Sequence, residues 1–292
     1  VFEASRDGEL RPAADPGGNL RIELPPARPA LEPAGWAAEL THELASLPGV
    51  RSRWRLDGVL SFEAGGLSFA RIAGGRVGYG VESDMPAGPG DRGRIAALAR
   101  ELATYRAAGA ADRNHALYRE RPELWLAAEA ERRPEALSPR LRPAPLYRGV
   151  PETHGRDSGV LDLLGCDRDG RLVVVELKSE EDIRLPFQAL DYWMAARAAR
   201  PGLWASAGYF PGLTLAEAEP RIVLAAPALK FHPRIGVLTA FLSPAIEIEF
   251  VGLNSDWRSG LRAEFRRAGR DAAPAGGSNV TFTTGSRGNS IA

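Results

Sequence analysis

The fold is decided by residues 158–193, which read SGVLDLLGCDRDGRLVVVELKSEEDIRLPFQALDYW. Two apolar runs are separated by residues 167–170, DRDG, a sequence typical of a tight hairpin turn. The second run is too apolar for an exposed edge and is typical of a strand buried in a core. We therefore expect strands at 160–165 and 171–178, followed by a helix at 184–199.

Each of these two predicted strands carries an acidic residue where a core strand would have an aliphatic one. Because side chains alternate between the faces of a strand, Glu176 and Lys178 project from the same face. If the strands pair through the hairpin, Asp162 lies beside Glu176. Two buried carboxylates repel each other, and burying such a pair is costly unless a cation neutralises it.

The predicted arrangement suits a hard divalent cation, Mg²⁺ or Mn²⁺, which prefers oxygen ligands and keeps several waters. Asp162, Glu176 and the backbone carbonyl of Leu177 form a partial shell, with room for a phosphate oxygen and a water. The metal would lower the pKa of that water, and Lys178 would orient it or stabilise developing negative charge. The alternative is an edge hairpin whose charged side chains are simply solvated.

Lysine is rare in this chain, which makes its position informative. Of 37 basic residues only Lys178 and Lys230 are lysine, and the other 35 are arginine, as a GC-rich genome would produce. Lysine presents a compact ammonium to a water or a phosphate oxygen, whereas arginine is a planar fork. We therefore interpret Lys178 as a residue with a chemical role, and Lys230 as incidental.

The helix expected after the second strand carries a further pair of polar residues. Gln188 and Tyr192 are four positions apart and share a helix face, close enough to the strand end to overhang the acids. Glutamine can contact a nucleotide or a metal-bound water, and tyrosine can contact a phosphate. The alternative is a surface glutamine and a half-buried tyrosine beside Trp193.

Together these features resemble the PD-(D/E)xK nuclease superfamily. Asp162 is followed after 13 residues by Glu176-Leu177-Lys178, and the Gln188-x-x-x-Tyr192 helix comes next. The Gln-x-x-x-Tyr element resembles the RecB-like branch, and the hairpin with its spacing is similar to NucS-type DNA endonucleases. The resemblance covers roughly residues 115–268.

The resemblance implies a restriction-endonuclease-like core, in which helices flank a central mixed sheet, and metal-dependent cleavage of DNA. It assigns metal binding to Asp162 and Glu176, catalysis to Lys178, and an accessory catalytic role to Gln188 and Tyr192. The family usually adds a glutamate from a helix before the first core strand. Two residues compete for that position: Glu123 is the first choice, and Glu129 is the second.

The rest of the sequence divides the chain into four parts. Residues 1–33, rich in Pro, Gly and Ala, predict an irregular segment. Residues 34–110 predict a small α+β domain that could bind nucleic acid. Residues 111–268 hold the nuclease-like domain, where alternating strands and helices favour the α/β class. Residues 269–292, which are Gly-, Ser-, Thr-, Asn- and Ala-rich, predict a disordered tail.

Periodicity and glycine-rich turns predict further elements along the chain. In the N-terminal part we expect a helix that begins at Trp36 and ends before Pro48, strands at 50–56, 58–64, 67–72 and 76–81, and a linker at 86–93. Farther along we expect helices at 92–107, 111–132 and 233–242, and strands at 145–150, 221–227, 246–252 and 261–266.

Arginines at alternate positions follow one predicted N-terminal strand. Arg51, Arg53 and Arg55 would share a face, while Val50 and Trp54 point the other way. Such a stripe can contact the phosphates of nucleic acid. A solvated sheet face is the competing interpretation.

Composition restricts the class of protein. The net charge is zero, so any grip on nucleic acid must come from local patches. One cysteine excludes an internal disulfide, and four scattered histidines argue against a zinc site. No apolar run is long enough to span a membrane, so we expect a cytoplasmic protein, and a homodimer is compatible with the sequence.

The sequence therefore predicts a Mg²⁺-dependent deoxyribonuclease of DNA repair or defence. The second interpretation is a nuclease-fold module that binds nucleic acid or a protein partner without cutting. The intact Asp162, Glu176 and Lys178 set favours the enzyme.

Overall fold

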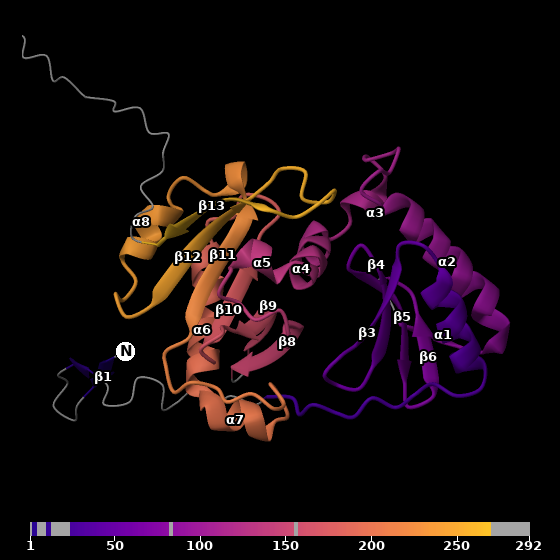
Figure 1. The fold of residues 1–292 in the computed structure, drawn as a ribbon, viewed down its shortest axis with the longest axis horizontal. Helices are drawn as coiled ribbons and strands as arrows, with labels where there is room; N and C mark the ends of the chain where they lie inside the picture. The colour runs from indigo at the N-terminus through magenta and orange to yellow at the C-terminus, as the bar shows by residue number, and fades with distance from the viewer. Residues whose placement is uncertain (1, 5–9, 13–23, 82–83, 155–156, 270–292) are drawn as a thin grey trace, which may run out of the picture.

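The computed structural model describes residues 2–4, 10–12, 24–81, 84–154 and 157–269 of the chain. It is a mixed α/β structure with two larger sheets that lie side by side as two lobes (Figure 1). Near the start, β1 (Phe2–Ala4) pairs antiparallel with β2 (Leu10–Pro12), so the segment expected to be irregular holds a short strand pair. The tail expected at 269–292 lies outside the described residues except for Gly269.

The N-terminal sheet is antiparallel, with its five strands in sequence order. Its strands are β3 (Val50–Trp54), β4 (Leu60–Ala64), β5 (Leu67–Ala73), β6 (Arg76–Tyr79) and β7 (Met85–Ala87). The four predicted strands are confirmed, but the predicted linker at 86–93 is wrong. Its first residues belong to β7, an edge strand, where a proline such as Pro86 is tolerated because one side of the strand needs no partner.

Two helices pack on this sheet. They are α1 (Trp36–Ser46) and α2 (Arg92–Tyr105), which begins directly after a short 3₁₀ turn, η1 (Pro89–Asp91). Leu40 and Leu44 of α1 and Ile95 of α2 are fully buried against the strand residues Phe62 and Phe69. The apolar residues whose spacing predicted both helices therefore face the core of this lobe.

The single helix predicted at 111–132 is broken in the structure. It consists of α3 (Ala116–Arg119) and α4 (Pro122–Arg132), and a further short helix, α5 (Pro134–Leu137), follows. The break lies at Arg121, whose φ is 39°. A residue before proline is disfavoured in the helical region, whereas proline is well suited to the first helical position, so Pro122 ends one helix and starts the next.

The C-terminal sheet is mixed, with six strands in the order β13-β12-β11-β10-β9-β8. The strands are β8 (Tyr147–His154), β9 (Asp157–Cys166), β10 (Leu172–Leu177), β11 (Arg221–Pro227), β12 (Glu247–Leu253) and β13 (Ala263–Ala268). β10, β11 and β12 run parallel, and the β9–β10 hairpin is antiparallel as predicted. The helices that follow are α6 (Leu185–Ala198), α7 (Arg200–Ser206), η2 (Ala228–Lys230) and α8 (Ile235–Ala240).

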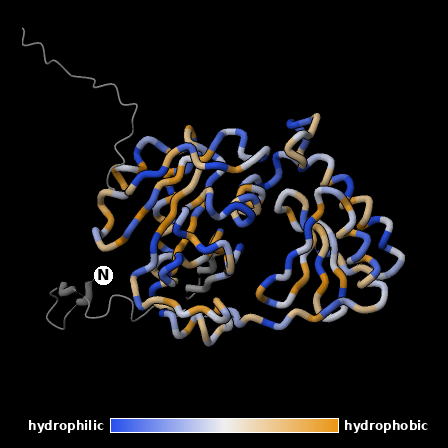
Figure 2. Tube along the Cα trace, viewed as in Figure 1, coloured by the Kyte–Doolittle hydropathy of each residue, from blue (hydrophilic) through white to orange (hydrophobic). Residues whose placement is uncertain are grey.

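Strand β10 is the centre of this lobe, and all six of its residues are buried. Val173, Val175 and Leu177 pack against α4, whereas Leu172 and Val174 face α6 and α7 on the other side. Figure 2 shows hydrophobic segments running along the central strands of both sheets. Among the described residues, none of the helices combines the length and the apolar character that a membrane span requires.

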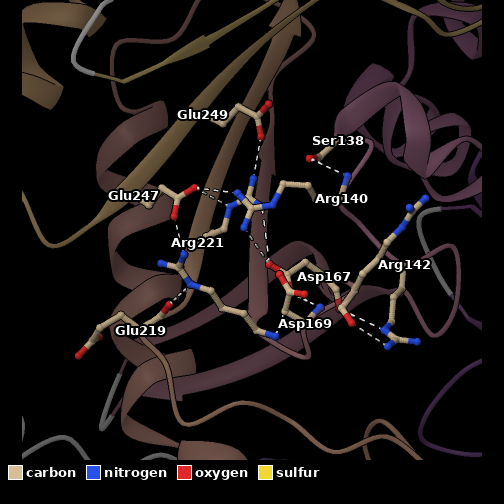
Figure 3. A network of polar contacts seen from close by, with 11 residues as sticks. Ser138, Arg140, Arg142, Asp167, Asp169, Glu219, Arg221, Glu247 and Glu249 are labelled. Atoms are coloured by element: carbon tan, nitrogen blue, oxygen red, sulfur yellow. Dashed lines mark hydrogen bonds and ion pairs between the residues drawn. The ribbon is translucent and has the colours of Figure 1, made fainter.

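A network of charged side chains lies at the amino-terminal ends of the parallel strands (Figure 3). Arg221, the first residue of β11, is 2% exposed and forms ion pairs with Glu249 at 2.8 Å and Glu247 at 3.2 Å. Asp167 lies 3.7 Å from the same guanidinium, and Arg171 also pairs with Glu247. The network contains charges of both signs in contact, so it neutralises itself.

The two lobes meet at a buried arginine. Arg106, which follows α2, donates hydrogen bonds to backbone carbonyls in the β4–β5 turn and around α3, and its guanidinium lies 5.1 Å from the centre of the Trp125 ring. The β4–β5 turn itself packs on α4: a Cβ at Gly66, whose φ is +74°, would overlap the carbonyl oxygen of Leu124. Nearby, Arg148 of β8 pairs with Glu63 of β4.

Replacing Arg106 tests how far the lobes depend on this contact. In Arg106→Met the carbonyls of Ala64, Gly65, Leu117 and Glu120 lose their donor, and we expect the free energy of unfolding to fall by at least about 2 kcal/mol. The matched control is Arg100→Met on α2, the helix that ends directly before Arg106, where the arginine is exposed. Chemical denaturation of both variants measures the difference, and equal stabilities would contradict the structural role of Arg106.

Candidate active site

The two acidic residues singled out in the sequence meet at the end of β10. The last pair of the hairpin is Val175 with Leu163, and Glu176 and Asp162 are the next residues of the two strands. The charge of Asp162 acts on Glu176, so the two carboxyl groups are close. The Asp162 carboxylate accepts a hydrogen bond from the backbone N–H of Leu177 at 2.8 Å. Beyond the last backbone pair between β9 and β10, the side chain of Asp162 therefore accepts the N–H that a backbone carbonyl would otherwise accept.

Burial changes the protonation of both carboxyl groups. Glu176 is only 2% exposed, and burial together with the charge of Asp162 raises its pKa to about 8, although Lys178 acts in the opposite direction. Burial raises the pKa of Asp162 to about 6, against the effects of the Leu177 amide and Lys178. Without further positive charge, the site therefore resists holding two ionised carboxylates.

Lys178 supplies only part of that positive charge. Its Nζ lies 3.1 Å from Oε1 of Glu176, as expected for neighbours on one face of a strand end. Oε2 of Glu176 is buried and has no hydrogen-bond partner among the described residues, and the same holds for Oε1 of Gln188. Buried acceptors are nearly always satisfied, so these two oxygens indicate a missing cation or a missing donor.

These residues fit a divalent cation of the magnesium type. Mg²⁺ in proteins is commonly held by one or two carboxylates and keeps several waters. Asp162 and Glu176 provide the carboxylates, and the Leu177 carbonyl points to the same side as the Leu177 N–H that Asp162 accepts. Within the described ranges there is no group of three or more His, Cys, Asp or Glu side chains that could hold a metal.

Of the two glutamates proposed as the upstream acid, Glu123 lies at the strand end. Its Oε1 accepts a hydrogen bond from the Ser179 hydroxyl at 2.6 Å, and its charge acts on Asp162. Glu129 instead forms an ion pair at 2.7 Å with Arg132, three residues later on the same helix. Sequence reasoning missed Ser179, and the one available signal was its position directly after Lys178.

Gln188 and Tyr192 both lie on α6, as predicted. Helix α6 packs on β10 and β11, and Gln188 belongs to its first turns. Tyr192, one turn later, is half-buried against the core cluster that contains Val174 and Trp204. The structure therefore brings Asp162, Glu176 and Lys178 into one site, and their catalytic roles, like those of Gln188 and Tyr192, remain predictions.

The predicted arginine stripe is not uniform. Arg51 is exposed on β3, whereas Arg53 is half-buried and lies 3.5 Å from Glu63 at the junction of the lobes. Burial lowers the pKa of Arg53, and the neighbouring Arg148 lowers it further. Arg55 pairs with Asp57 at 2.8 Å. Two of the three guanidinium groups therefore already have partners within the protein, although contact with nucleic acid stays a prediction for all three.

Comparisons with known proteins add no assignment. A scan against protein-family models finds no match, and a search of curated proteins finds none either. The function is therefore inferred from the geometry of the site.

The raised pKa of Glu176 predicts how stability depends on pH. The folded protein holds this proton up to about pH 8, whereas an unfolded chain releases it near the ordinary value of 4.5. Metal-free protein should therefore lose stability as the pH rises between these values, because the folded state binds more protons. We expect Glu176→Gln to remove this loss, so that its stability gain over the parent grows from pH 5 to pH 8.

Thermal melts across this pH range, in EDTA, measure the effect. Glu180→Gln, at an exposed residue of the adjoining loop, is the matched control and should follow the parent. Added Mg²⁺ should raise the melting temperature of the parent at pH 8 but not that of Glu176→Gln. Parallel curves for Glu176→Gln and the parent would contradict the buried, protonated state of Glu176.

Proposed function

We propose that this protein is a metal-dependent DNA nuclease that hydrolyses phosphodiester bonds, with a restriction-endonuclease-like PD-(D/E)xK core within residues 111–268. One observation carries the proposal: Glu176 is buried close to Asp162 and next to Lys178, and one of its oxygens has no partner among the described residues. Such an arrangement is costly for a structural hairpin, and it is the arrangement that a metal-assisted hydrolase requires.

Asp162, Glu176 and the Leu177 carbonyl would hold the cation, Mg²⁺ or Mn²⁺. When bound, the cation supplies neutralising charge and makes a water acidic enough to attack at neutral pH. Lys178 stands beside Glu176, where its ammonium can orient a water or stabilise negative charge that develops on a phosphate. Glu123, fixed by Ser179, adds a further acid at the same strand end.

DNA is the proposed substrate, and the N-terminal lobe is the proposed accessory surface. The lobe is joined to α4, the helix that carries Glu123, through Arg106 and the β4–β5 turn. Exposed Arg51 on β3 is available for contact with a phosphate. Cleavage of labelled single-stranded, duplex, branched and mismatched DNA, titrated with Mg²⁺ or Mn²⁺, tests the proposal directly.

Asp162→Asn should abolish metal-dependent cleavage and leave the fold intact. The amide oxygen can still accept the Leu177 N–H, but the charge that a cation needs is gone. Because burial disfavours the ionised acid, the metal-free variant should be as stable as the parent or slightly more stable. Asp169→Asn, at an exposed residue of the same hairpin turn, should cut like the parent. Parent-level cleavage by folded Asp162→Asn would remove Asp162 from the site.

Lys178→Arg should keep the fold and most of the DNA affinity but cut at least about 100-fold more slowly. Arginine retains the charge but is longer and planar, and a displacement of roughly 1 Å near the reacting atoms can cost about 100-fold in rate. Single-turnover cleavage with excess Mg²⁺ or Mn²⁺ measures the loss.

The matched control is Lys230→Arg, at the only other lysine, which pairs with Glu180 on the surface. It should have no effect on rate or melting temperature. If Lys178→Arg cuts at the parent rate, Lys178 is not catalytic, and a nuclease-fold module that binds without cutting becomes the better proposal.

A further inference from the structure

Arg258 is a further charged residue near the candidate active site. Strands β10, β11 and β12 are parallel, so their carboxyl ends lie on the same side of the sheet. Glu176 lies at that end of β10, and β12 ends at Leu253 on the same side. The loop 254–262, between β12 and β13, therefore starts beside the site, and it carries Arg258.

The loop is held in place by one buried side chain. Asn254 is fully buried, and its amide donates hydrogen bonds to Asp256 at 2.7 Å and to the Gly260 carbonyl at 2.9 Å. Its side-chain oxygen accepts the backbone N–H of Arg262 at 2.9 Å. Because these bonds close the loop on itself, Arg258 is presented from a fixed backbone.

Aromatic rings fix the guanidinium of Arg258. Its central carbon lies 4.2 Å from the ring centre of Trp257, 4.9 Å from that of Tyr118 and 5.2 Å from that of Trp125. Trp257 and Trp125 are buried in the core and meet edge to face. Contacts of this kind between a cation and ring faces are attractive and restrict the side chain to one orientation.

Arg258 nevertheless has no acidic group in direct contact among the described residues. Among the described residues it makes no hydrogen bond and no ion pair, and its Nε is buried without an acceptor. The nearest acid in its own loop, Asp256, is bound to Asn254 and Arg262. Two buried arginines contrast with the half-buried Arg258, since Arg106 donates to carbonyls and Arg221 pairs with glutamates.

The environment of Arg258 adjoins the proposed catalytic residues. Trp125, under its guanidinium, is two positions from Glu123, which accepts the hydroxyl of Ser179 next to Lys178. Burial lowers the pKa of Arg258, while the charges of Glu180 and Glu123 act on it in the opposite direction. Arg113 also acts on Arg258, so a second cation is close.

We propose that Arg258 binds a phosphate of the DNA strand adjacent to the phosphodiester that is cut. This inference rests on the proposed nuclease function, and it names a substrate contact outside the metal-binding residues. The terminal nitrogens of the guanidinium can donate two parallel hydrogen bonds to one phosphate, which is the interaction that arginine forms best. A preorganised cation that forms no ion pair would thereby gain a directly bonded anion.

The test measures binding of fluorescent single-stranded and duplex DNA in EDTA, which prevents metal-dependent cleavage. Arg258→Gln should weaken binding about tenfold, as expected for the loss of one charge-assisted hydrogen-bonded contact. The slope of log affinity against log salt should fall by about 0.7–0.9, as expected for one lost phosphate contact. The matched control is Arg267→Gln, because Arg267 lies 5.0 Å from the ring of Phe265 on the outermost strand β13.

Arg258→Lys separates charge from geometry. It should keep the salt slope of the parent but bind more weakly, and melting curves of all variants show whether the aromatic cluster survives. If Arg258→Gln melts below the assay temperature, Arg258→Lys carries the test, and parent affinity in that variant would overturn the proposal. So would parent affinity and slope in folded Arg258→Gln.

Cleavage by the same proteins separates this inference from the proposed function. A parent that binds DNA through Arg258 but never cuts it with Mg²⁺ or Mn²⁺ supports the phosphate contact and overturns the nuclease proposal. A parent that cuts DNA while Arg258→Gln binds and cuts equally well does the reverse. A parent that neither binds nor cuts DNA overturns both.

Discussion

The register between β9 and β10 is the constraint on which the site depends. Side chains alternate along a strand, so a slip by one residue would move Asp162 to the opposite face from Glu176. The register is held by a strand that is buried along its whole length and by the Leu177 N–H that Asp162 accepts. A hydrophobic core therefore fixes where two charges must meet, although the charges themselves oppose burial.

Buried charges at the two ends of the parallel strands in the C-terminal sheet differ in how they are balanced. Where the parallel strands begin, Arg221 is enclosed by Glu247, Glu249 and Asp167, and the positive and negative groups neutralise one another (Figure 3). Where they end, Glu176 keeps an acceptor without a partner among the described residues, although Lys178 is close. The charges of the first arrangement are balanced by its own ion pairs. At the second, burial raises the pKa of both Asp162 and Glu176 although Lys178 acts in the opposite direction, and this contrast favours a functional site at the carboxyl ends.

The sequence predicted those features that depend on local pattern. Leu40 and Leu44 at helical spacing, glycines in the turns and the apolar run at 172–177 each specify an element without knowledge of its neighbours. Features set by tertiary contacts could not be predicted in this way. Arg106 reads as one more arginine until the carbonyls around it are seen, and Arg258 becomes distinctive only when rings from three separate segments surround it.

The β4–β5 turn limits how independently the two lobes can vary. At Gly66 any side chain would strike the carbonyl of Leu124, the residue that follows Glu123. A larger residue in this turn would therefore push on the helix that carries a proposed catalytic acid, although the turn belongs to the other lobe. The N-terminal lobe is thus not an interchangeable module. A different lobe could take its place without displacing α4 only if it reproduced the shape of this glycine turn.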